Sequence, residues 1–175
     1  MKRLLKIAFG VAAVAALATP AFAQNSATQS TTSTTRIIQP ITLTKNTDLA
    51  FGSVVKPNAN TNTVAIDAST GTRSVTGAGD AALAPSASGR ATYTVSGEGG
   101  QTFSISTPAT FDMSKVGGSD TITVTLTQSA ATGTISGALG NSGSATFGVG
   151  GSFPVAATTA SGNYTGAFDV TVAYN

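Results

Sequence analysis

The clearest alternation of apolar and polar residues lies at the end of the chain. From Phe168 onward bulky apolar residues recur at every second position, which is the period of a β-strand with one buried face. That face consists of Phe168, Val170, Val172 and Tyr174. Because an exposed apolar strand of this kind would aggregate, the pattern predicts that it packs on a core.

A β-hairpin is predicted in the middle of the chain. Residues 90–96 and 101–106 both alternate, and the glycine-rich stretch 97–100 between them is typical of a turn. This interpretation places Tyr93 and Val95 opposite Phe103 and Ile105 across one strand pair.

Residues 121–127 alternate without interruption. Ile122, Val124 and Leu126 form one face and threonines form the other. One apolar and one polar face is typical of an antiparallel sheet.

The rest of the chain has weaker strand and turn signals, and Pro40 favours an edge strand or a bulge. Phe51 is predicted to be a core residue. Short strands are expected at residues 37–44, 49–55, 63–66, 72–76, 134–135, 145–149 and 152–155. Turns and loops are expected at residues 45–48, 56–61, 67–71, 77–89, 112–120, 133–143 and 150–151. About nine short strands without a helical period predict an all-β fold, an antiparallel β-sandwich.

The start of the chain has the pattern of a secretory signal peptide. A basic end, an apolar run and Ala21-Phe22-Ala23 follow one another, and the run is too short for a membrane span. We therefore expect a signal peptide at residues 1–23, export from the cell interior, and a protein that is not integral to a membrane. A Thr/Ser-rich extension at residues 24–36 and one β-sandwich domain at residues 37–175 would follow.

Charge and cysteine content narrow the function further. Of the nine basic residues, Lys2, Arg3 and Lys6 leave with the signal peptide, so six remain against seven acidic residues. The six are scattered, which argues against nucleic acid as a partner. Cysteine is absent, so an exported form must be stable without disulfides.

The chain offers little for catalysis. It has no histidine and no cysteine, which removes the usual proton shuttles, nucleophile pairs and zinc or copper ligands. Most carboxylates lie in predicted turns, where aspartate caps its own backbone. The glycine pattern at residues 77–82 lacks the following helix that a dinucleotide site needs, and no calcium-loop spacing is present. We predict no enzyme, cofactor or metal, although two carboxylates brought together in space would leave glycosidase-like chemistry open.

The end of the chain also resembles a known signature. With Tyr174 next to last and Gly162 upstream, it is similar to the C-terminal strand of chaperone–usher fimbrial subunits. Residues 40–43 with 49–52, 95–105, and 149–155 followed by 162–174 together resemble the bacterial secreted domain-of-unknown-function 4402 family, which is itself similar to the spore coat protein U domain. This resemblance implies an immunoglobulin-like sandwich exported in a Gram-negative cell, with a structural or adhesive role in a pilus, fimbrium or coat.

In fimbrial relatives the sandwich lacks a strand, which is supplied first by a periplasmic chaperone and then by the N-terminal segment of the next subunit. The resemblance thus implies other copies or related subunits, a chaperone and an outer-membrane usher as partners, with the cell surface or the outside as the final site. The contact residues would be Gly162, Phe168, Val170, Val172, Tyr174, Asn175, Arg36, Ile37 and Ile38.

The N-terminal segment fits this role incompletely. Residues 24–35 contain threonine and serine in place of bulky apolar residues, so a donor strand would use threonines or extend into Ile37 and Ile38. A flexible surface tail is the other interpretation. The main functional hypothesis is a structural subunit that polymerises by strand addition. The alternative is a self-contained secreted or periplasmic module that binds carbohydrate or protein, against which the lack of tryptophan argues.

Overall fold

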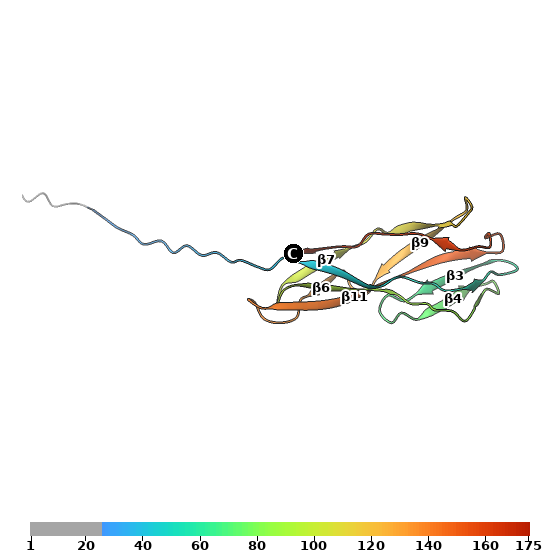
Figure 1. Ribbon diagram of the computed structural model, residues 1–175, viewed down its shortest axis with the longest axis horizontal. Coiled ribbons are helices and arrows are strands. Elements are labelled where there is room, and N and C mark those ends of the chain that lie inside the picture. The colour runs from blue at the N-terminus through green and yellow to red at the C-terminus, as the bar shows by residue number, and fades with distance from the viewer. Residues whose placement is uncertain (1–25) are drawn as a thin grey trace, which may run out of the picture. The chain divides into compact units, whose positions relative to one another are not determined.

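The computed structural model describes residues 26–175, so the predicted signal peptide lies outside the described residues. Residues 26–35 are exposed and have no regular secondary structure. Residues 36–175 form a compact unit built of antiparallel strands, shown in Figure 1. No helix occurs within the described range, and the predicted all-β fold is confirmed.

The strands are short except for one near the C-terminus. They are β1 (Thr42–Thr47), β2 (Val54–Val55), β3 (Thr61–Ile66), β4 (Arg73–Gly77), β5 (Ala82–Leu83), β6 (Ala91–Glu98), β7 (Thr102–Ser106), β8 (Thr110–Lys115), β9 (Thr121–Gln128), β10 (Thr132–Thr134), β11 (Ser142–Ala156), β12 (Tyr164–Thr165) and β13 (Thr171–Tyr174).

Two sheets enclose one core. The larger sheet has the order β1-β6-β11-β9-β8-β12, and β3 joins it at β11 and carries β4. The smaller sheet has the order β10-β7-β13, and β2 pairs with β5 separately. Buried side chains of both sheets, among them Val95 of β6, Phe103 of β7 and Val149 of β11, belong to the same apolar cluster. The molecule is therefore an antiparallel β-sandwich.

Strand β11 runs through both halves of the larger sheet. Its first half pairs with β6, and Gly151–Ala156 pair with β3. Between these, Val149–Ser152 pair with β9. The turn predicted at residues 150–151 is therefore wrong, because these glycines lie in extended backbone inside a continuous strand of 15 residues.

The glycines of β11 allow neighbouring backbone to approach closely. A Cβ atom on Gly151 would lie 2.8 Å from the carbonyl oxygen of Thr125, and one on Gly150 would collide with the carbonyl oxygen of Ile66. Glycine inside a strand often marks such an approach. The paired glycines 150–151 therefore mark close packing of neighbouring strands and not a turn.

We predict that Gly150→Ala lowers the free energy of unfolding by about 1–3 kcal/mol, because the added methyl group must displace backbone. Gly89→Ala is the matched control, since a Cβ atom there meets nothing within 4 Å. Its effect should stay within about 0.5 kcal/mol. Urea unfolding of both variants measures the difference, and equal effects would contradict the close-approach explanation.

The predicted hairpin of residues 90–106 is also wrong. β6 pairs with β1 and β11 in the larger sheet, whereas β7 pairs with β10 and β13 in the smaller one. The connection crosses from one layer to the other, with Gly100 at a positive φ of 73°. Tyr93, Val95, Phe103 and Ile105 are all buried in one core. These residues belong to the same core but to different sheets, so β6 and β7 do not pair by backbone hydrogen bonds.

Several boundaries differ from the predictions because polar residues alternate with buried ones. The predicted loop 112–120 begins with most of β8, where Phe111 and Met113 pack against the core. The predicted turn 45–48 is largely the end of β1, with an irregular register between Lys45 and Thr47. The predicted loop 77–89 contains the strand β5. The predicted linker 133–143 contains the last residues of β10 and the first residues of β11.

The strand predicted over residues 37–44 begins only at Thr42. Ile37 is 91% exposed, whereas Ile41 and Leu43 pack against the core, so the predicted common face of the three residues is wrong for Ile37. The strand predicted over residues 49–55 shortens to β2, but Phe51 is a core residue as expected.

The C-terminal strand is a core element, as its alternation predicted. Phe168, Val170, Val172 and Tyr174 are partly buried and pack against the core cluster. β13 pairs with β7, and the Phe168 ring lies 5.0 Å from that of Phe111.

Candidate functional site

Tyr174 joins the two ends of the compact unit. Its hydroxyl donates to the carbonyl oxygen of Gln39 (2.9 Å) and accepts from the backbone N–H of Glu98 (2.8 Å). Gly97 provides the space, because a Cβ atom there would collide with the Tyr174 hydroxyl. The penultimate residue of the chain thus holds the backbone just before β1.

The Glu98 side chain binds the same backbone segment as Tyr174. This side chain is 3% exposed and carries no ion-pair partner among the described residues. One carboxylate oxygen accepts from the N–H of Gln39 (3.3 Å) and the other from the N–H of Gly140 (2.5 Å). Both backbone groups of Gln39 are therefore bound. We call Gln39, Glu98 and Tyr174 the clasp.

Tyr174→Phe should lower the free energy of unfolding by about 1–3 kcal/mol, because the partly buried N–H of Glu98 loses its acceptor. Tyr93→Phe is the control, since the Tyr93 hydroxyl makes no hydrogen bond within residues 26–175. Chemical denaturation compares the two. A Tyr174→Phe protein as stable as the control would show that the clasp contributes nothing.

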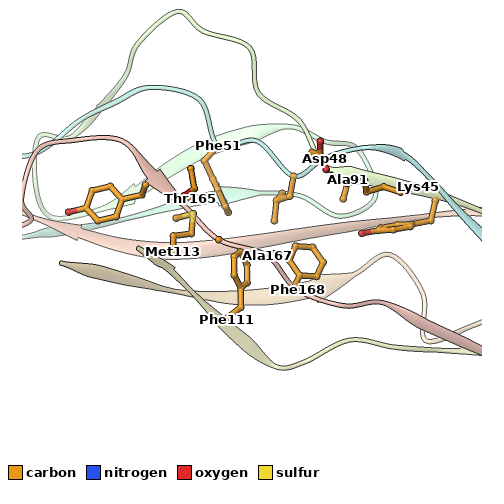
Figure 2. Close-up of a pocket in the computed structure, with 13 residues that line it drawn as sticks. Lys45, Asp48, Phe51, Ala91, Phe111, Met113, Thr165, Ala167 and Phe168 are labelled. Atoms are coloured by element: carbon orange, nitrogen blue, oxygen red, sulfur yellow. Dashed lines mark hydrogen bonds and ion pairs between the residues drawn. The ribbon is translucent and has the colours of Figure 1, made fainter. Parts of the chain in front are cut away.

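A groove lies between two segments that are distant in the sequence. It consists of two adjoining hollows of about 290 and 730 Å³, which share Leu49, Phe51, Met113, Tyr164 and Thr165. Residues 45–56 form its N-terminal wall and residues 159–168 its C-terminal wall. Figure 2 shows the smaller hollow, with Phe51, Asp48 and Lys45 in the upper part of the view and Ala167 and Phe168 below them.

The floor of the groove is apolar. Phe111 and Met113 of β8 lie beneath the smaller hollow, and Phe153 and Val155 of β11 lie beneath the larger one. The Phe51 ring meets that of Phe153 edge-on at 4.9 Å.

The charges at the groove are held at its rim. Lys45 and Asp48 form an exposed ion pair of 2.5 Å, and this carboxylate raises the pKa of Lys45. Burial raises the pKa of Tyr93 beside them. At the far end the Lys56 ammonium group donates to the carbonyl oxygen of Ala157 (2.9 Å). Among the described residues that line the two hollows, the charged side chains lie at the rim.

The N-terminal wall is fixed by Arg73. Its guanidinium donates to the carbonyl oxygens of Phe51 (2.8 Å) and Ala84 (2.7 Å), and also to that of Ser53 (3.3 Å). Gly52, at a φ of 68°, leaves room for this guanidinium. Hydrogen bonds within the domain therefore fix the position of this wall.

The C-terminal wall presents unpaired backbone, and β1, whose Lys45 borders the smaller hollow, has one free edge. Within the described residues, β1 pairs with β6 alone and β13 with β7 alone. Residues 166–170 continue the alternation of β13, but their N–H and C=O groups form no backbone hydrogen bond within residues 26–175. Backbone polar groups that face an open strand edge are available for pairing with another strand.

Residues 41–174 match the model of the protein family described as Domain of unknown function (DUF4402). The chain belongs to this family. No curated protein and no solved structure matches the chain. The match begins just before β1 and ends at Tyr174, so this DUF4402 domain includes both walls of the groove and leaves out residues 26–40.

The structure separates the predicted contact residues of this DUF4402 protein into three places. Phe168 lies in the C-terminal wall, Val170 lies between this wall and β13, and Val172 and Tyr174 lie in β13. The N–H of Asn175 donates to the carbonyl oxygen of Thr102. Gly162 lies in the larger hollow at a φ of 153°. Arg36, Ile37 and Ile38 are exposed and lie outside both hollows.

Sequence reasoning missed four residues of the clasp and the groove. Gln39 and Glu98 had no signal beyond ordinary loop composition, because their role depends on contacts across 59 positions of sequence. Phe111 and Met113 had a sequence signal, because they alternate with the polar residues Asp112 and Ser114 as in a half-buried strand.

The prediction that aspartates cap the backbone of their own turns is confirmed for Asp67, but not for every aspartate of the DUF4402 domain. The Asp67 carboxylate accepts from the N–H groups of Ser69 (2.9 Å) and Thr70 (2.6 Å), and the Thr70 hydrogen bonds lower its pKa. Asp80 instead accepts from the side-chain amide and the backbone N–H of Asn58 in another part of the chain (2.7 Å each), which lowers the pKa of Asp80. Asp112 is an exception, because it lies in β8 and accepts from the Thr123 hydroxyl.

No cluster of three metal-ligating side chains occurs in the part of the chain that the structure describes. Within residues 26–175 no helix has the length and hydropathy that a membrane crossing requires.

The lowered pKa of Asp67 makes stability depend on pH. Its charge stabilises the fold above the pKa of an unfolded aspartate, about 4, and this contribution is lost as pH falls through the lower folded pKa. Asp67→Asn should therefore lower the melting temperature at neutral pH, with the difference from the parent shrinking below about pH 4. Asp169→Asn is the control, because Asp169 is exposed and makes no hydrogen bond within residues 26–175. A pH-independent difference would contradict the charge effect.

Proposed function

We propose that this protein is an exported structural subunit of a cell-surface assembly, fimbria-like or coat-like, which polymerises by β-strand addition through its N-terminal segment. The observation that carries the proposal is the unpaired backbone of residues 166–170, whose first three residues line the smaller hollow together with Lys45 of β1, a strand with one free edge. An added strand would gain main-chain hydrogen bonds from the edges and register from alternate side chains.

The nature of the groove favours a mechanical role over a chemical one. Its floor is apolar, its charges lie at the rim, and its N-terminal wall is held by Arg73. A catalytic site would require a nucleophile, base or metal close to the space where the substrate binds. The groove therefore supports association with a polypeptide.

The N-terminal segment has the properties of a donor. Residues 26–38 are exposed and form no strand within the described chain. They are rich in threonine and end in two isoleucines, and β-branched residues favour strands. The clasp holds the chain at Gln39, so the segment starts from a fixed point.

Export and passage through the periplasm belong to the same proposal. Residues 1–23 have the composition of a signal peptide. A subunit with an open groove would aggregate before assembly, so a periplasmic chaperone that covers the groove and an outer-membrane usher are the proposed partners.

Deletion of residues 24–36 tests the proposal. The mature chain, expressed with periplasmic helpers, should form fibres or large oligomers visible by electron microscopy and light scattering. The truncated chain should remain monomeric, because it lacks the donor strand. Its unfolding transition should match that of the full chain, which controls for folding.

Two results would contradict the proposal. Undiminished polymer after the deletion would remove the donor role from the segment. A mature protein that stays a stable monomer under all conditions would favour a self-contained binding module.

A further inference from the structure

We infer that a third hollow, around Arg90 on the outer face of the larger sheet, binds an acidic sugar at the end of a glycan. The Arg90 guanidinium would hold the sugar carboxylate, and nearby polar side chains would hold the sugar hydroxyls. This site goes beyond the proposed assembly and does not depend on strand addition. We call it the outer hollow.

The outer hollow is separate from the groove. It shares no lining residue with either hollow of the groove. Tyr93 and Val95 of β6 lie in the core, so Thr92, which lines the outer hollow, projects from the opposite face of the sheet. The neighbours Lys45 and Asn46 divide in the same way, because Lys45 lines the groove and Asn46 lines the outer hollow. A ligand in the outer hollow would therefore leave the groove open.

The outer hollow has the size and the lining of a site for a polar ligand. Its volume is about 430 Å³, and small-molecule sites usually measure about 300–1,000 Å³. Its polar and charged lining residues are Asn46, Ser69, Arg90, Thr92, Ser129 and Thr146. Phe147 also lines it but is only 7% exposed, so charge and hydrogen bonds, and not ring stacking, would carry recognition.

One edge of the Arg90 guanidinium is available to a ligand. Its Nη1 atom donates to the carbonyl oxygens of Ala68 (2.8 Å) and Ser69. Its Nε and Nη2 atoms form no hydrogen bond within residues 26–175, and neither is a buried atom without a partner, so both reach solvent. Two parallel N–H groups on one edge match the two oxygens of a carboxylate. A carboxylate is therefore the ligand group that this edge fits.

Backbone packing fixes the position of this edge. A Cβ atom on Gly148 of β11 would lie 2.8 Å from Cδ and 3.1 Å from Nε of Arg90, so the side chain lies close against the strand. The Nη1 atom is bound to the backbone that follows β3. A group that is already ordered loses less conformational entropy when it binds a ligand.

The charge of Arg90 has no ion-pair partner within the described residues. Hydrogen bonds from Thr70 lower the pKa of Asp67 most, and the charge of Arg90 adds to this effect. The Asp67 carboxylate nevertheless accepts from Ser69 and Thr70 in its own turn and forms no ion pair with Arg90. A direct charge-assisted pair with Arg90 is thus left to a ligand.

Around this cation lie donors and acceptors suited to sugar hydroxyls. The Ser129 hydroxyl accepts from the N–H of Gly148 (2.9 Å), which leaves its own hydrogen to donate. Thr146 is exposed, and its hydroxyl forms no hydrogen bond within residues 26–175. The amide nitrogen of Asn46 donates to the Thr94 hydroxyl (2.9 Å), which leaves the amide oxygen to accept. A ligand with several hydroxyl groups would use all three side chains.

The polar surface continues beyond the outer hollow along β1, β6 and β11. Rows of hydroxyl residues cross these strands on the same face, with about 7 Å between one row and the next. The residues of the first two rows are Thr44, Thr94 and Thr146, and then Thr42, Ser96 and Ser144. The next sugars of a glycan would find hydroxyl groups along this face.

Two glycosides that differ in one group test the inference. Methyl β-glucuronide carries a carboxylate where methyl β-glucoside carries a CH₂OH group, and the methyl group of both stands for the rest of a glycan. Titration of the mature chain, followed by NMR of the backbone amides, should show the glucuronide binding at least tenfold tighter, because only its carboxylate pairs with Arg90. The amide shifts should centre on Ser129 and Thr146. Acetate, a carboxylate without a sugar, should bind at least tenfold more weakly than the glucuronide.

A pair of substitutions at exposed strand positions provides the matched comparison. Thr146→Glu adds a carboxylate at the outer hollow that competes for Arg90, and it should weaken glucuronide binding at least tenfold. Thr76→Glu on β4 adds the same charge at a position that lines none of the three hollows, and it should change binding less than twofold. Both residues are exposed, so both proteins should melt close to the temperature of the parent.

Arg90→Lys tests the guanidinium edge itself. This substitution keeps the charge and removes the pair of parallel donors, so glucuronide affinity should fall at least tenfold. Because Arg90 also binds the backbone after β3, the melting curve of this variant is recorded as well. If the variant fails to fold, the comparison of Thr146→Glu with Thr76→Glu decides.

Each other outcome overturns a stated part of the inference. Equal binding of glucuronide and glucoside overturns the carboxylate as the recognised group. Acetate binding as tight as that of the glucuronide overturns a sugar as the ligand and favours a peptide carboxyl terminus. Binding of free glucuronate without binding of the methyl glucuronide overturns the glycan and leaves a free sugar. Absence of binding by every probe overturns the site.

The test is independent of the proposed assembly. Deletion of residues 24–36 should leave glucuronide affinity unchanged, because these residues do not line the outer hollow. A protein that fails to polymerise but binds the glucuronide contradicts strand addition alone. A protein that polymerises without binding the glucuronide contradicts the sugar site alone.

Discussion

The main-chain hydrogen bonding of β11 is the interaction on which the rest of the fold depends. This strand pairs with β6 along its first half, with β3 along its second half and with β9 in the middle. Its glycines leave space that the backbones of Ala68, Ile66 and Thr125 occupy. The backbone groups of β11 are thereby paired with neighbouring strands on both edges along much of its length.

The two ends of the domain are joined by hydrogen bonds in place of a covalent link. Tyr174 and Glu98 bind both backbone groups of Gln39, and the C-terminal strand completes the smaller sheet beside β7. A buried carboxylate that accepts only from N–H groups is costly unless those partners stay in place. The clasp therefore sets where the N-terminal segment leaves the domain.

The two walls of the groove differ in how completely their backbone is hydrogen-bonded. Arg73 and the β2–β5 pair hold one wall of the groove, whereas residues 166–170 have packed side chains and unpaired backbone. Segments that bind partners commonly have fewer local hydrogen bonds than the core. The groove combines apolar side chains beneath it, a wall held by side-chain hydrogen bonds and a wall with unpaired backbone.

By itself, the sequence determined the all-β class and the strands with the clearest alternation, such as residues 121–127 and the C-terminal face from Phe168 to Tyr174. Period-two alternation is a local property of the backbone, so local residues suffice to predict it. It also placed Phe51 in the core and Asp67 in a turn.

Only the tertiary structure decided which strands pair. The glycines of β11 look like a turn until the neighbouring backbones are present, and residues 90–106 look like a hairpin until the two layers separate them. The clasp and the groove likewise join residues that lie far apart along the chain, such as Gln39 with Tyr174 and Lys45 with Phe168. Their positions follow from long-range packing, which local sequence patterns do not contain.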